Sequence, residues 1–266
     1  MFKFRRKTRA EIKAETVDAL FRSDEAGTIS NAFGLLGTAN RYRRNEISTG
    51  VNFYSAGIGA KTLVVGFGTA KGRLAMPVFM VLEALDDRRY DLLLLSDLSN
   101  CHFDHGIDGY ALTLPDLMRR VGDFAGGRGY GSIITFGTSM GGFPALRGGD
   151  LLGADRSISV GGRFPWHPVR LEKGRRRVQA FDALCDCRNP YRSPFYLLHS
   201  RNHREDQLHA EMMKKIAPAS RVIVFPGEGH AVQNRIRQKG RLDAFFLEML
   251  DLNKEPDQDK LVAMLD

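Results

Sequence analysis

The chain has 266 residues, of which 43% are hydrophobic and 26% are charged, and its formal net charge at pH 7 is +8. A chain of this length and composition can bury its own core, which excludes the collagen-like and intrinsically disordered classes. No apolar run reaches the length of a membrane span, so we expect no membrane-spanning segment.

The N-terminal segment from Met1 to Lys7 is basic. No apolar stretch or small-residue cleavage site follows it, which argues against a secretory signal. The three cysteines, Cys101, Cys185 and Cys187, make a poor disulfide framework, and the last two lack the C-x-x-C spacing of redox motifs. We therefore expect a cytoplasmic protein.

Positive charge is concentrated in two segments, Lys3 to Lys13 and Arg163 to Arg177. Solvated surface charge is one interpretation, and an anionic substrate or partner is the other. No aromatic-interleaved basic repeat or recognised nucleic-acid module accompanies the charge, so we expect no nucleic-acid partner.

The hydrophobic pattern predicts strands and helices that alternate from about residue 60 onward. The expected strands are 41–48, 51–56, 61–68, 90–95, 132–136, 156–160, 194–199 and 221–225. The expected helices are 5–22, 76–85, 112–124, 143–151, 206–216 and 242–252. This alternation predicts an α/β fold with a mostly parallel central sheet and helices on both faces.

The same pattern divides the chain into three parts. Residues 1–40 are expected to form a helical extension, 41–252 the α/β domain, and 253–266 a polar C-terminal tail. Within the domain, 161–193 fits neither period and is long for a connection between two elements. We expect this segment to be an insertion that covers the strand tips as a lid.

A candidate nucleophile lies between the expected strand 132–136 and the expected helix 143–151. Gly137 to Gly141 reads Gly-Thr-Ser-Met-Gly, a G-x-S-x-G pattern centred on Ser139. A strand, a sharp turn and a helix are the context in which such a serine is exposed as a nucleophile. The flanking glycines fit this turn, because side chains there would collide with the neighbouring strand and helix. The alternative is a glycine-rich turn that carries a surface serine.

A nucleophilic serine needs a base to take its proton and a carboxylate to orient that base. In an open α/β sheet such residues lie beyond the carboxyl ends of the strands. His230 follows the last expected strand and is the predicted base. The loop after strand 194–199 contains Glu205 and Asp206, and we favour Asp206 as the acid. Glu205 is the alternative acid, and Asp206 has an alternative role as the N-cap of the following helix.

The order Ser139, Asp206, His230 resembles that of the α/β-hydrolase superfamily. Gly137 to Gly142 resembles the nucleophile turn of that family, and Phe225 to His230 is similar to its histidine loop. The resemblance spans roughly residues 60 to 250 and implies the superfamily fold, with acyl-group hydrolysis or transfer as its commonest activity.

The resemblance also implies an oxyanion hole built from backbone N–H groups. One would come from Met140, directly after the nucleophile, and the other from Gly68 or Thr69 in the loop after strand 61–68. The chain departs from the family here, because Phe67-Gly68 stands where many members have His-Gly.

Three further side chains are expected to line the substrate pocket: Phe67, Trp166 and His203. Two groups of side chains are candidate metal ligands. These are Cys101, His102, Asp104 and His105, and His199, His203 and His209. Neither group has a spacing specific for zinc, so we expect no metal and no other cofactor.

The sequence therefore predicts a serine hydrolase that cleaves a carboxylic ester or thioester through Ser139, His230 and Asp206 and an acyl-enzyme. The expected substrate is a small molecule or an acyl carrier, and the basic segment favours one with a negative group. Two alternatives remain: an acyltransferase that uses the same acyl-enzyme, and a non-catalytic binding protein on the same fold.

Overall fold

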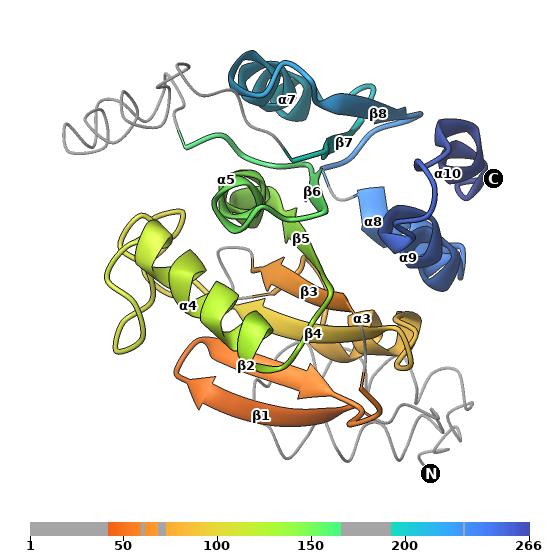
Figure 1. Cartoon of the computed structure of the whole chain (residues 1–266). Helices are drawn as coiled ribbons and strands as arrows, with labels where there is room; N and C mark the ends of the chain where they lie inside the picture. Colours follow the sequence, from red (N-terminus) through yellow and green to blue (C-terminus); the bar gives the residue numbers. More distant parts are fainter. Residues whose placement is uncertain (1–41, 60–61, 69–72, 166–192, 231) are drawn as a thin grey trace, which may run out of the picture.

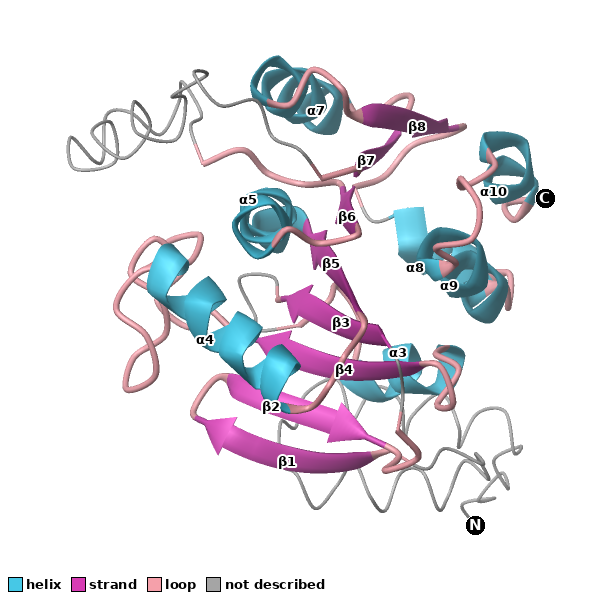
Figure 2. Ribbon diagram, viewed as in Figure 1, coloured by secondary structure: helices cyan, strands magenta, loops and turns pink. Residues whose placement is uncertain are grey.

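The computed structural model describes residues 42–59, 62–68, 73–165, 193–230 and 232–266. At its centre is an eight-stranded sheet in the order β1-β2-β4-β3-β5-β6-β7-β8, with helices on both faces (Figures 1 and 2). The expected helix 5–22 and most of the expected lid lie outside the described residues.

All eight strands were predicted from the sequence to within two residues at each end. They are β1 (Arg43–Ser48), β2 (Val51–Ser55), β3 (Thr62–Phe67), β4 (Tyr90–Leu95), β5 (Ser132–Thr138), β6 (Arg156–Val160), β7 (Phe195–Ser200) and β8 (Arg221–Phe225). The pairs β1–β2 and β2–β4 are antiparallel, and the five other pairs are parallel. The prediction of a mostly parallel sheet is confirmed.

The helices lie in two layers. They are α3 (Val78–Ala84), α4 (Leu114–Gly127), α5 (Gly142–Leu152), α7 (Arg204–Ile216), α8 (Val232–Gln238), α9 (Leu242–Leu250) and α10 (Gln258–Ala263), with the short 3₁₀ helix η1 (Ser139–Gly141) before α5. Helices α4, α5 and α7 cover one face of the sheet, and α3, α8, α9 and α10 cover the other (Figure 2). Within the described part of the chain, every helix is too short or too polar to span a lipid bilayer.

The apolar run Leu92–Leu95 of β4 is explained by burial on both faces. Successive side chains of a strand point to opposite sides of the sheet. Leu92 and Leu94 accordingly pack into the core on the α9 side, whereas Leu93 and Leu95 pack into the core on the α4 side. A strand covered by helices on both faces needs apolar residues at every position, which gives the pattern of a parallel sheet.

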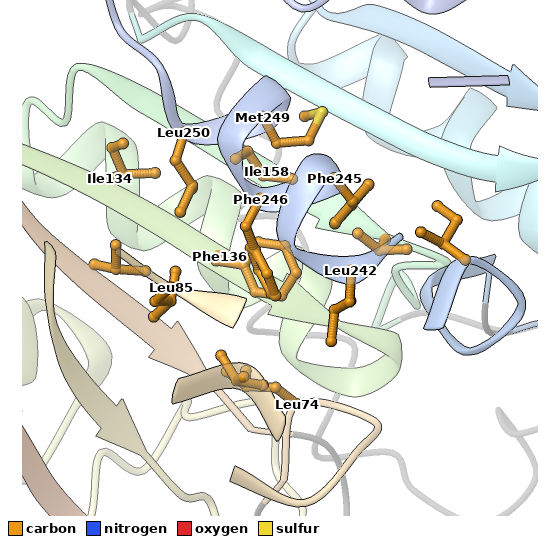
Figure 3. Packing of buried hydrophobic residues seen from close by; sticks show 14 of the residues in the cluster. Leu74, Leu85, Ile134, Phe136, Ile158, Leu242, Phe245, Phe246, Met249 and Leu250 are labelled. Carbon is orange, nitrogen blue, oxygen red and sulfur yellow. The ribbon is translucent and has the colours of Figure 1, made fainter. Parts of the chain in front are cut away.

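Helix α9 packs against the middle of β5 (Figure 3). The ring of Phe246 lies against that of Phe136, with 5.6 Å between the centroids, and Ile134 belongs to the same cluster. Full burial of a phenylalanine side chain contributes about 1.5–3 kcal/mol relative to exposure. This packing therefore fixes the strand that directly precedes Ser139.

The C-terminal segment, expected as a polar tail, contains α10. Leu261 and Leu265 are buried in the same core cluster as α9, and the Asp257 side chain accepts hydrogen bonds from the first backbone N–H groups of α10. Neither α10 nor α8 was predicted from the sequence. Each is only one to two turns long, so its apolar residues do not establish a helical period.

Candidate active site

Ser139 lies at the turn between β5 and α5, where the sequence predicted a nucleophile. Its φ angle is +51°, in the left-handed region. Backbone strain of this kind costs about 1–3 kcal/mol and needs support from the surrounding structure. Part of that support is visible, because the backbone N–H of Arg163 donates to the Ser139 carbonyl oxygen at 2.7 Å.

The two glycines of the G-x-S-x-G pattern are required by close packing. A side chain at Gly137 would collide with the carbonyl oxygen of Gly141 and with Ala145 of α5. A side chain at Gly141 would collide with the carbonyl oxygens of Phe67 and Gly68 at the end of β3. Side chains at these two positions would therefore collide with a neighbouring strand and the following helix, as predicted. With glycines there, η1 packs directly against β3.

Three elements distant in the sequence bring Ser139, His230 and Asp206 together. The Nε2 atom of His230, in the loop between β8 and α8, lies 2.8 Å from Ser139 Oγ. The Nδ1 atom of the same ring lies 2.7 Å from Asp206 Oδ1, in the first turn of α7. Both distances are those of hydrogen bonds. With Nδ1–H donated to the carboxylate, Nε2 is left to accept the serine proton.

Glu205, the alternative acid, is directed away from His230. Its carboxylate lies 3.9 Å from the Arg163 guanidinium and 3.7 Å from His209 Nε2. Asp206, in contrast, is only 2% exposed and meets the imidazole directly. The geometry therefore favours Asp206 over its neighbour for the contact with His230.

Helix α7 begins at Arg204, two residues before the start expected from the sequence, and His203 is its N-cap. The Asp206 N–H donates to His203 Nδ1 at 3.3 Å, so Asp206 occupies the third helical position and does not cap the helix. Histidine is not among the residues preferred at an N-cap, which is why the sequence pattern missed this start. The carboxylate lies at the positive end of the helix dipole, which favours its charge.

His203, which was expected to line the pocket, contacts the acid. Its Nδ1 lies 3.0 Å from Asp206 Oδ1, and its ring centroid is 5.4 Å from that of His230. The ligand atoms of these three residues all lie within 4.8 Å of one another, which is close enough for a metal ion. Tetrahedral zinc ligands at about 2.0–2.1 Å from the metal are roughly 3.3 Å apart. The 2.7 Å spacing between Asp206 and His230 fits a shared proton better.

Gly161, in the loop after β6, was not identified from the sequence. Its φ angle is +53°, and a Cβ atom there would lie 2.5 Å from the His230 carbonyl oxygen and 3.1 Å from Asp206 Oδ2. The glycine therefore makes room for the histidine–aspartate pair. The Gly161-Gly162 doublet directly after an expected strand is a turn signal that could have indicated this position.

The three expected oxyanion donors differ in whether the structure leaves their backbone N–H groups available. Met140 is the second residue of η1, and the first N–H groups of a helical turn have no acceptor within it. The Gly68 N–H, however, donates to the Leu95 carbonyl oxygen at 2.9 Å and so extends the pairing of β3 with β4. Gly68 is therefore a poor choice of donor. Thr69, the alternative, lies outside the described residues.

Phe67 does not line a pocket, which corrects the expectation. Its side chain is fully buried in the core on the α4 side, 5.2 Å from the Phe103 ring in an edge-to-face contact. The alternation of β3 directs it into the helix-covered face. Trp166, the third expected pocket residue, lies outside the described residues.

No protein-family model matches the chain, and no curated protein matches it in sequence. Solved structures do match. The alignment with TT1662 from Thermus thermophilus covers 79% of this chain and 99% of that one, at 17% identity and a TM-score of 0.54. MenH from S. aureus gives 78% and 100% coverage, 14% identity and a TM-score of 0.51.

The 2,6-dihydroxy-pseudo-oxynicotine hydrolase aligns over 94% of this chain and 77% of its own, at 16% identity and a TM-score of 0.53. Likenesses at such low identity bear on the fold. They agree with the eight-stranded, mostly parallel sheet and with the resemblance in the sequence. The chain has the α/β-hydrolase fold.

Proposed function

We propose that this protein is a serine hydrolase that cleaves a carboxylic ester or thioester. The observation that carries the proposal is the hydrogen-bonded series from Ser139 Oγ through His230 to Asp206, with distances of 2.8 and 2.7 Å. A serine held in a left-handed turn beside such an imidazole is how an α/β sheet presents an activated nucleophile. The likeness to a named hydrolase supports the reaction type.

In the first half of the proposed reaction, His230 Nε2 takes the proton of Ser139 Oγ as this oxygen attacks the acyl carbonyl carbon. The resulting oxyanion accepts hydrogen bonds from the backbone N–H groups of Met140 and Thr69. Collapse of this intermediate breaks the bond to the leaving alcohol or thiol, which receives the proton from His230. Asp206 keeps Nδ1 protonated and stabilises the imidazolium that forms in between.

In the second half, water replaces the leaving group. His230 removes a proton from the water as it attacks the acyl carbon of the ester formed with Ser139. The second tetrahedral intermediate then expels Ser139 Oγ, which regains a proton from His230. The acid product leaves, and each residue returns to its starting state.

The proposed substrate is a small molecule or an acyl carrier that bears a negative group. Arg163 opens the basic segment from Arg163 to Arg177, and its N–H donates to the carbonyl oxygen of Ser139. The basic segment therefore begins in a residue whose backbone contacts the nucleophile turn, and its guanidinium lies 3.9 Å from the Glu205 carboxylate. The positive charge of the segment in the sequence favours an anionic ligand.

A fluorophosphonate probe tests the nucleophile. Wild-type protein is expected to become labelled, and Ser139→Ala to remain unlabelled, because the probe reacts only with an activated serine. Labelling of both proteins at another residue, or none in a folded wild type, would favour a non-catalytic binding protein on the same fold. An ester assay with added alcohols and amines then separates hydrolysis from acyl transfer.

A matched pair of variants tests the acid. Asp206→Asn is expected to slow labelling by about 10³–10⁴-fold, because the wrong histidine tautomer is then favoured. Glu205→Gln changes the neighbouring carboxylate, which points to Arg163, and is expected to remain within a few-fold of wild type. The assignment of the acid is wrong if the Glu205 variant alone loses the reaction.

A further inference from the structure

The loop that carries His230 owes its conformation to contacts with other elements. Between the end of β8 and His230 lie Gly227 and Gly229, whose φ angles are +85° and +107°. Glycine adopts many backbone conformations at little cost, so a loop with two glycines does not fix its own shape. Glu228 and Gly229 are exposed, so packing contributes little there. The position of the proposed base therefore depends on hydrogen bonds to the loop.

The first part of this loop is held by two elements. The backbone N–H of Asn202, in the segment after β7, donates to the Gly227 carbonyl oxygen at 3.2 Å. The Arg235 guanidinium, on α8, donates to the Pro226 carbonyl oxygen at 2.6 Å. Both contacts lie at least three residues before His230, so they leave the end of the loop to be fixed by another group.

The side chain of Ser200, the last residue of β7, reaches the end of the loop. Its hydroxyl donates to the Gly229 carbonyl oxygen at 2.7 Å, which is the usual length of such a bond. Ser200 has an exposed fraction of 0%, so its hydroxyl is held in place by the surrounding core. A buried donor therefore orients the peptide group that joins Gly229 to His230.

The next carbonyl group of the chain, that of His230, lies against Gly161, where a Cβ atom would be 2.5 Å from its oxygen. Two successive carbonyl groups are thus placed by neighbouring strands, β7 and β6. The imidazole has to meet Ser139 Oγ at 2.8 Å and Asp206 Oδ1 at 2.7 Å at the same time. A small rotation of the peptide group before it would lengthen at least one of these contacts.

We propose that Ser200 is a positioning residue for the base His230. This inference rests on the proposed serine-hydrolase function. The Ser200 hydroxyl takes no part in the proton transfers, and it acts through the carbonyl group of Gly229. It holds the glycine-rich end of the loop in the one conformation that brings the imidazole between the nucleophile and the acid.

The kinetics of fluorophosphonate labelling in Ser200→Ala test this inference. The variant removes one buried oxygen atom and takes away the hydroxyl that Gly229 accepts from. The rate constant at saturating probe is expected to fall about tenfold, because a hydrogen bond of ordinary strength no longer holds the base. The probe concentration that gives half of this rate is expected to stay within about twofold of wild type, because the change is buried.

Ser220→Ala is the matched control. Ser220 is also buried, and its hydroxyl donates to the Ala217 carbonyl oxygen at 2.6 Å. It directly precedes β8, so it lies at the opposite end of that strand from the histidine loop. Both variants are expected to lower the urea midpoint of unfolding, but Ser220→Ala should be labelled at the wild-type rate. Equal saturating rates in the two variants would overturn the inference, because a merely structural hydrogen bond predicts that result.

Backbone amide NMR signals of Glu228, Gly229 and His230 give an answer that does not depend on catalysis. In Ser200→Ala these signals are expected to shift or broaden, whereas in Ser220→Ala they should keep their wild-type positions. Unchanged signals in Ser200→Ala would contradict the inference even if no protein became labelled. Shifted signals together with an unlabelled wild type would count against the proposed function alone.

Discussion

At the scale of single residues, the site depends on backbone positions that few residue types can occupy. Ser139 has a φ angle of +51° and Gly161 one of +53°. The serine is held there by close packing of its flanking glycines and by the hydrogen bond from Arg163. Gly161 lies against the carbonyl oxygen of His230 and the carboxylate of Asp206. Its lack of a side chain thus determines where the base and the acid meet.

Gly161→Ala is expected to displace His230. The new Cβ atom would lie 2.5 Å from the His230 carbonyl oxygen, so the loop must move. Because a misplacement of about 1 Å can cost a hundredfold in rate, we expect fluorophosphonate labelling to slow by about 10–100-fold.

Gly153→Ala is the control for backbone strain. Gly153 has a φ angle of +61° and no atom within 4 Å of the position of a Cβ. Both variants should lose about 1–2 kcal/mol of stability from the left-handed conformation, measured by urea unfolding. Equal labelling rates in the two variants would contradict a specific role for Gly161.

At the scale of elements, β5 is held from both faces of the sheet. On one face Phe136 packs against Phe246 of α9. On the other, Thr135 Oγ1 donates to the Ala145 carbonyl oxygen of α5 at 2.7 Å and lies 2.8 Å from Ser157 Oγ of β6. The strand and the helix on either side of Ser139 are therefore joined by buried contacts, which keeps the turn between them rigid.

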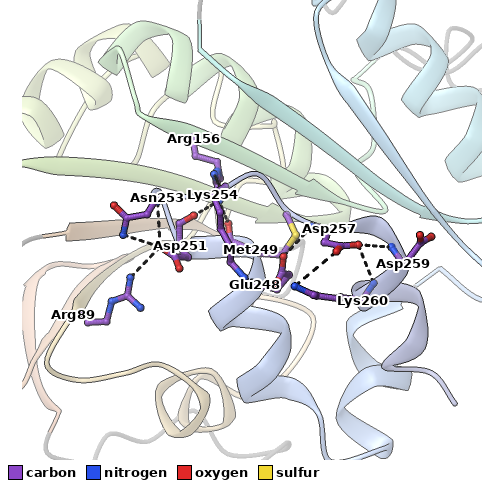
Figure 4. A network of polar contacts seen from close by, with 10 residues as sticks. All are labelled: Arg89, Arg156, Glu248, Met249, Asp251, Asn253, Lys254, Asp257, Asp259 and Lys260. Carbon is purple, nitrogen blue, oxygen red and sulfur yellow. Dashed lines mark hydrogen bonds and ion pairs between the residues drawn. The ribbon is translucent and has the colours of Figure 1, made fainter.

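The Arg156 side chain joins β6 to the last turn of α9 and to the segment that follows it (Figure 4). This guanidinium donates to the carbonyl oxygens of Met249, Asp251 and Lys254 at 2.8, 3.0 and 2.7 Å. Arg156→Ala leaves these acceptors without their donor, so we expect the free energy of unfolding in urea to fall by about 3 kcal/mol.

Arg89→Ala is the matched control in the same network. Arg89 is partly exposed and lies 3.4 Å from Asp251 Oδ1, so its loss is expected to cost less than about 1 kcal/mol. Equal losses in the two variants would show that the buried carbonyl contacts of Arg156 do not stabilise the C-terminal segment.

At the scale of the whole molecule, the C-terminal segment completes the core. Leu261 of α10 is buried with residues of β5, β6 and α9. Tyr196 of β7 donates its hydroxyl hydrogen to Glu255, which precedes α10. Removal of the segment would therefore expose core side chains of the central strands.

The stability of the protein at alkaline pH tests the contact between Tyr196 and the C-terminal segment. Burial, together with the hydrogen bond to Glu255, raises the pKa of Tyr196 to about 12 from 10.0. The neutral phenol is favoured in the folded protein, so its stabilising effect is complete below pH 10 and is lost as the pH rises to about 12. Urea unfolding at several pH values should show a smaller alkaline loss for Tyr196→Phe than for wild type. Parallel curves would contradict the prediction.

The sequence by itself determined the layers of the molecule and the nucleophile turn. Strands such as Tyr90–Leu95 are apolar at every position except Asp91 because both faces are covered, and this pattern is local. The same is true of Gly137 to Gly141, whose glycines fit only a tight turn. Periodicity and turn chemistry act over a few residues, so they could be recognised without a structure.

Only the tertiary structure decided which neighbouring groups face the site. Glu205 and Asp206 are adjacent on α7 and project about 100° apart, so the cap at His203 decides which one meets His230. Gly68 donates its N–H to Leu95, and Gly161 lies beneath the histidine–aspartate pair, because strands distant in sequence meet there. These contacts join segments separated by tens of residues, and no local pattern specifies them.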